Sequence, residues 1–254
     1  MRQNKLREPI ALCLGIALVA ALVQLAAWLK GAPLVFPSVG EILRTFLCLL
    51  GEAETWRRVG TTLLHLVLSL VFAGAGGLLF GTAMGLSDFC RTLLSPLMQF
   101  LRATPMIVMA VIAMVLLPYD RVPLVVPSLL LIPLISEAVG EGIRRIDPEL
   151  RDVWRLNSRF NARILLQVYL PLTAGYLRQA FANAAGMGMK LAVTTEYLVQ
   201  TRDSLGKAIF SSSYFNDYPE VYAYALVMIL LVMLLTGLPG LFRALLRRIR
   251  PPRS

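Results

Sequence analysis

Runs of about twenty apolar residues constrain the fold of this chain more than any other feature. Each run approaches the ~20 residues that an α-helix needs to cross the roughly 30 Å hydrocarbon core of a bilayer. The six runs lie at 9–29, 58–86, 93–118, 122–141, 172–199 and 221–243. Composition agrees, because 57% of the 254 residues are hydrophobic and 16% are charged, against about 25% charged in a soluble domain. We expect an all-α polytopic membrane protein of about six transmembrane helices, with 1–254 as one domain.

The distribution of basic residues predicts the orientation of the spans. With the N-terminus in the cytoplasm, fifteen of the 25 Lys and Arg residues fall inside and seven fall outside. Cytoplasmic loops carry the excess of basic residues in membrane proteins, so both termini are predicted to be cytoplasmic. The apolar run at 9–29 exceeds the 7–15 residues of a signal-peptide core, which predicts an uncleaved first span. Pro96 and Arg102 interrupt the run at 93–118, whose first turns we expect at the membrane interface.

Two local patterns predict further structure: a capped helix before the second apolar run, and a row of glycines within that run. The segment 38–51 reads as an external amphipathic helix, with Ser38 as its N-cap and Glu41 completing a capping box. Within the second run, small residues recur every four positions, at Gly77, Gly81 and Gly85. This spacing lets helix backbones approach closely. We interpret it as tight packing within the chain, with an interface between two copies as the alternative.

The distribution of reactive side chains argues against a metal site and against a membrane enzyme. Cys13, Cys48 and Cys90 are scattered without a C-x-x-C spacing, and His65 is the single histidine. One histidine cannot form a zinc site, so His65 is expected to be a packed helix residue. A membrane enzyme needs a cluster of His, Cys or carboxylate groups at one membrane level, and the acidic residues here are dispersed.

The loop at 144–171 is charged and helix-like, although it lies between two apolar runs. Asp147 and Pro148 form a typical helix start, and arginines then recur every four residues from Arg151 to Arg163. Trp154 and Phe160 are aromatic residues on a predicted cytoplasmic loop and need a lipid or protein surface to cover them. Aromatic and arginine side chains are common anchors of protein interfaces. We therefore predict that this loop docks on a soluble partner, with a solvated or lipid-head-group-facing arginine stripe as the alternative.

The loop resembles the cytoplasmic E-A-A-x-x-x-G signature of ATP-binding-cassette (ABC) importer permeases. Aligned on Leu170–Pro171, Asp152 takes the glutamate position, Val153 and Trp154 the alanines, and Ser158 the glycine. Four further stretches resemble the nitrate, sulfonate, taurine and bicarbonate branch of these permeases in the same order. They are "FPSVGEILRTF", "LSPLMQFLRATP", "EGIRRIDPELRDV" and "MGMKLAVTTEYLVQTRDSLGKAI".

This resemblance implies a type I importer permease of the bacterial inner membrane. Two copies would form the pore, and two cytoplasmic ATPases would bind the coupling loop. A periplasmic or lipid-anchored binding protein would deliver the solute. ATP and Mg²⁺ would bind the ATPases, because this sequence has no G-x-x-x-x-G-K-[ST] loop and no cofactor or catalytic site is expected in it. The residues implied to dock the ATPase are Asp147, Glu149, Arg151, Asp152, Val153, Trp154, Arg155, Ser158 and Phe160.

Charged residues within or near the spans are candidate pathway or structural sites, because ionisable groups in a membrane are costly. We single out Arg102, Lys190 and Glu196. Lys190 and Glu196 lie six apart on one helix, which is not a pairing distance, so each is expected to find a partner elsewhere. For Lys190 we expect a structural ion pair, with substrate attraction as the alternative.

One other transport mechanism and two solute classes remain open from the sequence. A transporter driven by an ion gradient would need an intramembrane carboxylate relay and often carries an inverted repeat. Glu196 is the one deep carboxylate in the sequence, and no repeat is visible. The resemblance leaves both a small anion and a thiamine-precursor-like heterocycle as solutes, and both a homodimeric and a heterodimeric pore.

Overall fold

The computed structural model is helical throughout the residues that it describes, which are 37–147, 165–249 and isolated positions between 14 and 28. Most of the predicted first span and residues 148–164 of the coupling loop lie outside this described part. The elements are α2 (Val39–Gly51), α3 (Ala53–Leu86), α4 (Asp88–Ala103), α5 (Met106–Leu116), the 3₁₀ turn η1 (Tyr119–Arg121), α6 (Val122–Arg144), the π-helical turn η2 (Leu165–Tyr169), α9 (Leu170–Val199), α10 (Leu205–Tyr214) and α11 (Tyr218–Ile249).

Three helices in the described part have the length and apolar composition to cross a membrane. They are α3, the helix over Tyr119–Arg144 and the part of α11 over Tyr218–Gly237. α4 and α5 together meet the same condition and would be a fourth, broken span. α9 coincides with the predicted fifth span and is long enough, but it is less apolar and carries Arg178, Lys190 and Glu196.

The predicted span over 93–118 is divided into α4 and α5, which meet at an angle of 99°. The break lies at Thr104–Pro105, where Thr104 is extended and Pro105 precedes the first turn of α5. A residue before proline is disfavoured in the helical conformation, which ends α4 at this point. The helix continues through Pro96, the residue that the sequence indicated as an interruption.

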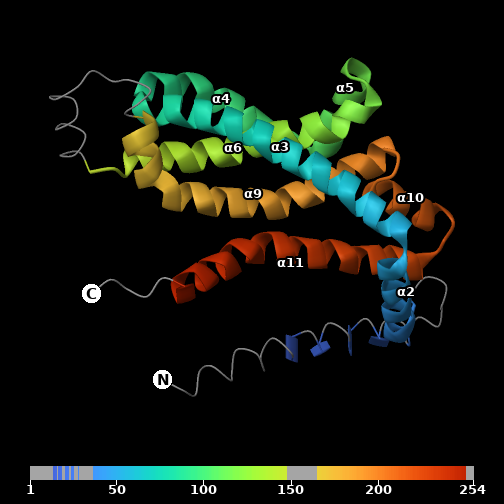
Figure 1. Cartoon of the computed structure of the whole chain (residues 1–254). Coiled ribbons are helices and arrows are strands. Elements are labelled where there is room, and N and C mark those ends of the chain that lie inside the picture. Colours follow the sequence, from blue (N-terminus) through green and yellow to red (C-terminus); the bar gives the residue numbers. More distant parts are fainter. Residues whose placement is uncertain are drawn as a thin grey trace.

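The predicted amphipathic helix is confirmed as α2. The side chain of Ser38 accepts a hydrogen bond from the Glu41 backbone N–H, and Glu41 accepts one from the Ser38 backbone N–H at 2.8 Å. This backbone bond, with the bond from the Ser38 hydroxyl, lowers the pKa of Glu41 below its usual value. α2 lies at the end of the bundle where α11 begins (Figure 1).

Close packing of α3 on α6 forms the centre of the bundle, and it uses the predicted glycine face. A Cβ at Gly77 would lie 2.5 Å from Cγ2 of Ile135, and one at Gly81 would lie 2.6 Å from the carbonyl oxygen of Ser136. At Gly85 a Cβ would meet Ile143 at 2.9 Å. These contacts lie within one chain, as the favoured interpretation predicted.

α9 covers the same centre from a second side, so that α3, α6 and α9 run along one another (Figure 1). Their shared core buries Ala73 of α3, Leu131 and Ile135 of α6, and Ala184 of α9. The outward faces of α3, α5 and α11 remain apolar and exposed in the single chain, as Leu79, Val115 and Met233 illustrate. Such faces are expected where a helix contacts lipid or a second membrane subunit.

We predict that Gly81→Ala destabilises the protein by about 1–3 kcal/mol, because the added methyl group overpacks the α3–α6 contact. Gly60 is the matched control on the same helix, since a Cβ there has no heavy atom within 4 Å. Gly60→Ala is expected to raise stability by about 0.5–1 kcal/mol. Thermal unfolding of the purified variants in detergent measures both effects. A melting temperature of Gly81→Ala at or above that of the wild type would contradict close α3–α6 packing.

Candidate functional site: a polar groove between α4 and α6

α4 is amphipathic and presents a polar stripe along its whole length. The stripe consists of Asp88, Arg91, Ser95, Gln99 and Arg102, which are spaced three or four residues apart and so share one face of the helix. Met98 and Leu101 are buried beside it. A continuous polar stripe cannot face hydrocarbon without a large cost. It therefore needs water or polar protein groups opposite to it.

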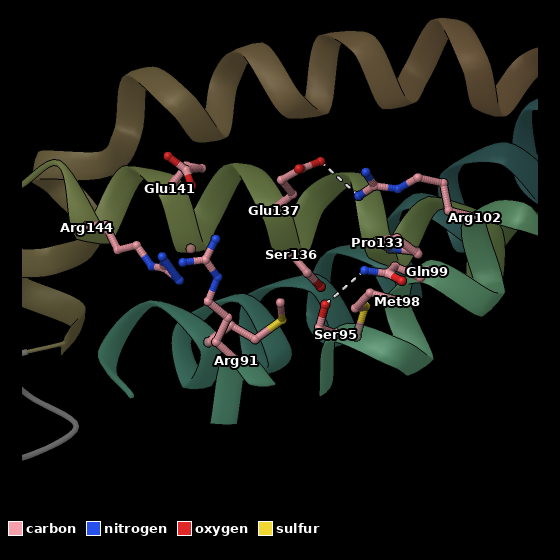
Figure 2. Close-up of a pocket in the computed structure, with 12 residues that line it drawn as sticks. Arg91, Ser95, Met98, Gln99, Arg102, Pro133, Ser136, Glu137, Glu141 and Arg144 are labelled. Carbon is pink, nitrogen blue, oxygen red and sulfur yellow. Dashed lines mark hydrogen bonds and ion pairs between the residues drawn. The ribbon is translucent and has the colours of Figure 1, made fainter. Parts of the chain in front are cut away.

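α6 supplies the polar groups that face part of this stripe. Ser136, Glu137, Glu141 and Arg144 recur on one side of α6, and together with α4 they line a cavity of about 160 Å³. Figure 2 shows the side chains of the two helices reaching into the space between them. Three arginines and two glutamates line this cavity, so its formal charge is positive by one. We call this feature the polar groove.

Arg102 and Glu137 form an ion pair across the groove, with 2.8 Å between Nη2 and Oε2 (Figure 2). Both side chains are more than half exposed in the single chain, at 55% and 59%. An exposed pair of this kind contributes little to stability, about 0–1 kcal/mol. Its main effect is to place two opposite charges on the wall of a hydrated groove rather than to hold the helices together. Arg102 was expected at the membrane interface, and its partner 35 residues away was not predicted from the sequence.

For Lys190 the described residues contain no partner of the kind that the sequence predicted, a structural ion pair. Its side chain is exposed on α9, and no carboxylate of the described residues lies within ion-pair distance. Substrate attraction was the alternative for Lys190, and it stays a prediction. Of the residues predicted to dock an ATPase, Asp147 lies just beyond the end of α6, and the other eight lie outside the described residues.

Glu196 was predicted to have a partner other than Lys190, and the structure identifies its partners. Its carboxylate is fully buried and lies 2.8 Å from Thr62 Oγ1 and 2.7 Å from His65 Nδ1. It also accepts a hydrogen bond from the Gly206 backbone N–H at 3.2 Å. Glu196 therefore contacts two residues of α3 and the backbone of α10. His65 is packed as predicted, with a side chain 13% exposed.

This network fixes the start of α10 against α3 and α9. The backbone N–H of Leu205 donates to Thr62 Oγ1 at 3.0 Å, so the first residues of α10 bond both to α3 and to Glu196 on α9. Gly206 is required for this approach, because a Cβ there would lie 2.4 Å from the Glu196 Cβ and 2.5 Å from the Tyr197 nitrogen. The single deep carboxylate is therefore engaged in a structural network and does not line the polar groove.

We predict that Glu196→Ala lowers the free energy of unfolding by about 3 kcal/mol or more, because it leaves buried donors on α3 and α10 without an acceptor. Glu137→Ala removes the exposed carboxylate of the Arg102 pair and is the matched control, with an expected loss of at most about 1 kcal/mol. Thermal unfolding in detergent compares the two variants. Equal losses would show that the Glu196 network does not hold α10 in place.

Comparisons with known proteins agree on one family. Residues 73–251 match the family described as the binding-protein-dependent transport system inner membrane component. The taurine transport system permease protein TauC of Escherichia coli K12 is 25% identical over 265 residues, covering 98% of this chain and 94% of that protein. A probable ABC transporter permease of Brucella melitensis biotype 1 is 24% identical over 215 residues, with 82% of this chain and 86% of that protein covered.

A solved structure gives the same fold. A chain of the MetNI methionine ABC transporter, solved in inward-facing conformations, superimposes with a TM-score of 0.66 and 19% identity. The match covers 75% of this chain and 95% of that one. An all-helical chain with apolar spanning helices, a polar groove and a family match over most of its length leads to one conclusion. The chain belongs to the family of binding-protein-dependent transport system inner membrane components.

Proposed function

We propose that this permease subunit carries a small organic anion across the bacterial inner membrane along the polar groove. The observation that carries the proposal is the groove itself, which places three guanidinium groups and two carboxylates between α4 and α6 of an otherwise apolar protein. Charged residues within membrane proteins mark substrate paths by default. The excess of one positive charge favours an anion over an uncharged heterocycle, and one relative is a permease for taurine.

Family membership implies an ATPase partner and a substrate-binding protein for this non-catalytic membrane subunit. We place the ATPase contact on the loop after α6, with Asp147 at its start. α6 carries the groove residues Ser136–Arg144 and ends at this loop, so a displacement of the loop would act directly on one wall of the groove. ATP and Mg²⁺ are bound by the two ATPase subunits, whose closure moves the loop.

The arrangement of the helix ends supports an orientation in which the end of α11 and the loop after α6 lie on the same side of the membrane, as the predicted cytoplasmic C-terminus requires. Figure 1 shows α11 ending at the same end of the bundle as α6, whereas α2 and α10 lie at the opposite end. We assign the end at Arg144 to the cytoplasm, because the flanking segments carry most of the basic residues. The end with α2 and α10 then faces the binding protein.

We further propose that each permease chain is one domain over 1–254. A second copy of this chain completes the pore. The groove is open in the single chain, since Gln99, Arg102 and Glu137 along it are exposed. Exposed apolar residues on the neighbouring helices, such as Phe100 and Val111, would be covered by that copy or by lipid. A closed path for a charged solute needs walls on all sides, because an open groove would expose the solute to hydrocarbon.

The docking loop is tested by the double variant Trp154→Ala/Arg155→Ala. We expect it to lose the co-purifying ATPase in mild detergent, because it removes an aromatic and an arginine anchor from the coupling loop. The matched control is Trp56→Ala/Arg57→Ala, which removes the same two residue types in the same order near the start of α3, at the opposite end of the bundle. Quantitative mass spectrometry of the purified complexes gives the ratio of ATPase to permease. A stoichiometric ATPase in both double variants would refute docking through this loop.

A further inference from the structure

We propose that Arg91 and Arg144 form a binding site for a singly charged oxyanion at the cytoplasmic end of the polar groove. The ligand class is a sulfonate or carboxylate head group, and its assignment to the transported solute rests on the proposed function. The site itself rests on the geometry and electrostatics of the groove.

Arg91 and Arg144 face each other from different helices. Arg91 lies in the first turn of α4, and Arg144 is the last residue of α6. Both line the polar groove. Figure 2 shows their guanidinium groups reaching toward each other across the space between the helices. Arg144 is half-buried in the single chain. This arrangement brings two like charges together at one end of the cavity.

The carboxylates of the groove are engaged with other arginines. Glu137 pairs with Arg102 at 2.8 Å, and Glu141 lies 3.8 Å from Arg145, which does not line the cavity. Among the described residues, no carboxylate lies within ion-pair distance of Arg91 or Arg144. Within the described part of the chain, these two are therefore the groove arginines without a direct counter-ion.

Two converging guanidinium groups repel each other. An anion bound between them attracts both, so that the net electrostatic interaction of the three groups becomes favourable. Unit charges 4 Å apart interact by about 1 kcal/mol in water and by about 4 kcal/mol near a protein surface. Guanidinium groups bind carboxylate and similar oxyanions through two parallel N–H···O bonds. Glu141 still counts toward the groove, because its pair with Arg145 is exposed and long, at 3.8 Å. The groove as a whole therefore carries one net positive charge, which matches a monoanion better than a dianion.

Ser136 provides a second and independent sign that the groove takes a polar ligand. The Ser136 side chain is 1% exposed, and its hydroxyl has no hydrogen-bond partner although it lines the same cavity. Buried hydroxyl groups are normally hydrogen-bonded. Ser136 lies eight residues before Arg144, which is about 12 Å along the helix axis. A solute leaving Ser136 would thus meet the arginine pair two turns later on its way to the cytoplasm.

Anion binding to the purified transporter complex tests the proposal. Isothermal titration with methanesulfonate is carried out on the complex in nanodiscs of phosphatidylcholine, without nucleotide. We expect Arg91→Gln/Arg144→Gln to weaken binding at least tenfold, and each single variant to weaken it measurably. Arg178→Gln is the matched control, because Arg178 is an arginine on α9 outside the groove. Sulfate, a dianion, is expected to bind more weakly than methanesulfonate.

A lipid arm distinguishes the two sources of an oxyanion. Native mass spectrometry of the complex from nanodiscs with phosphatidylglycerol counts retained anionic lipids in the same variants. Loss of methanesulfonate binding in the double variant supports a solute site, whereas loss of phosphatidylglycerol alone supports the same site occupied by a lipid head group. If neither ligand depends on Arg91 and Arg144 more than on Arg178, the proposal is overturned. Should the double variant not assemble, the two single variants decide the question.

Failure of this inference is separable from failure of the proposed function. Binding is measured without ATP, and co-purification of the ATPase is recorded on the same wild-type sample. If the ATPase co-purifies but anion binding does not depend on Arg91 and Arg144, the proposed site is refuted and the permease function is retained. If anion binding depends on the two arginines but no ATPase co-purifies, the site is supported and the proposed permease function is refuted.

Discussion

The close contact between α3 and α6 is the constraint on which the rest of the structure depends. Gly77, Gly81 and Gly85 let the two helices approach until a single added methyl group would collide with α6. α4 follows α3 after one residue, Ser87, so the position of α3 also sets where the polar stripe of α4 can lie. One side of α6 packs into the core through Ile135 and Val139, and the adjacent side faces the groove. The groove exists because these helices are held at a fixed spacing.

Two sets of ionisable side chains, Glu196 and those of the polar groove, lie in contrasting environments. Glu196 is fully buried and bonded to groups on α3 and α10, which suits a structural role that joins α10 to the bundle. The charges along the groove are exposed or half-buried, and their pairing is incomplete. A buried charge without partners is very costly, whereas a hydrated charge with spare donors remains free to bind. This contrast is the physical reason for placing solute contacts in the groove and not at Glu196.

Sequence patterns predicted the local features of the fold well, because these depend on neighbouring residues. The capping box of Ser38 and Glu41, the helical spans and the small-residue face of α3 all follow from spacing along the chain. The angle between α4 and α5 was missed, because two prolines compete as breakers and only Pro105 ends a helix. The pairings Arg102–Glu137 and His65–Glu196 join residues 35 and 131 positions apart. Periodicity within one helix carries no information about such partners.

The central claim is that the polar stripe of α4 faces water while the rest of that helix does not. Single cysteines at Gln99 and Phe100 test it most directly, in a chain whose three native cysteines are replaced by serine. Both side chains are exposed in the single chain, and they lie on different faces of α4. A negatively charged thiol reagent reacts with the thiolate, which forms in water and not in hydrocarbon. The account predicts rapid modification of Gln99→Cys in membrane vesicles and slow modification of Phe100→Cys. Equal rates, or a faster reaction at Phe100→Cys, would contradict a hydrated groove between α4 and α6.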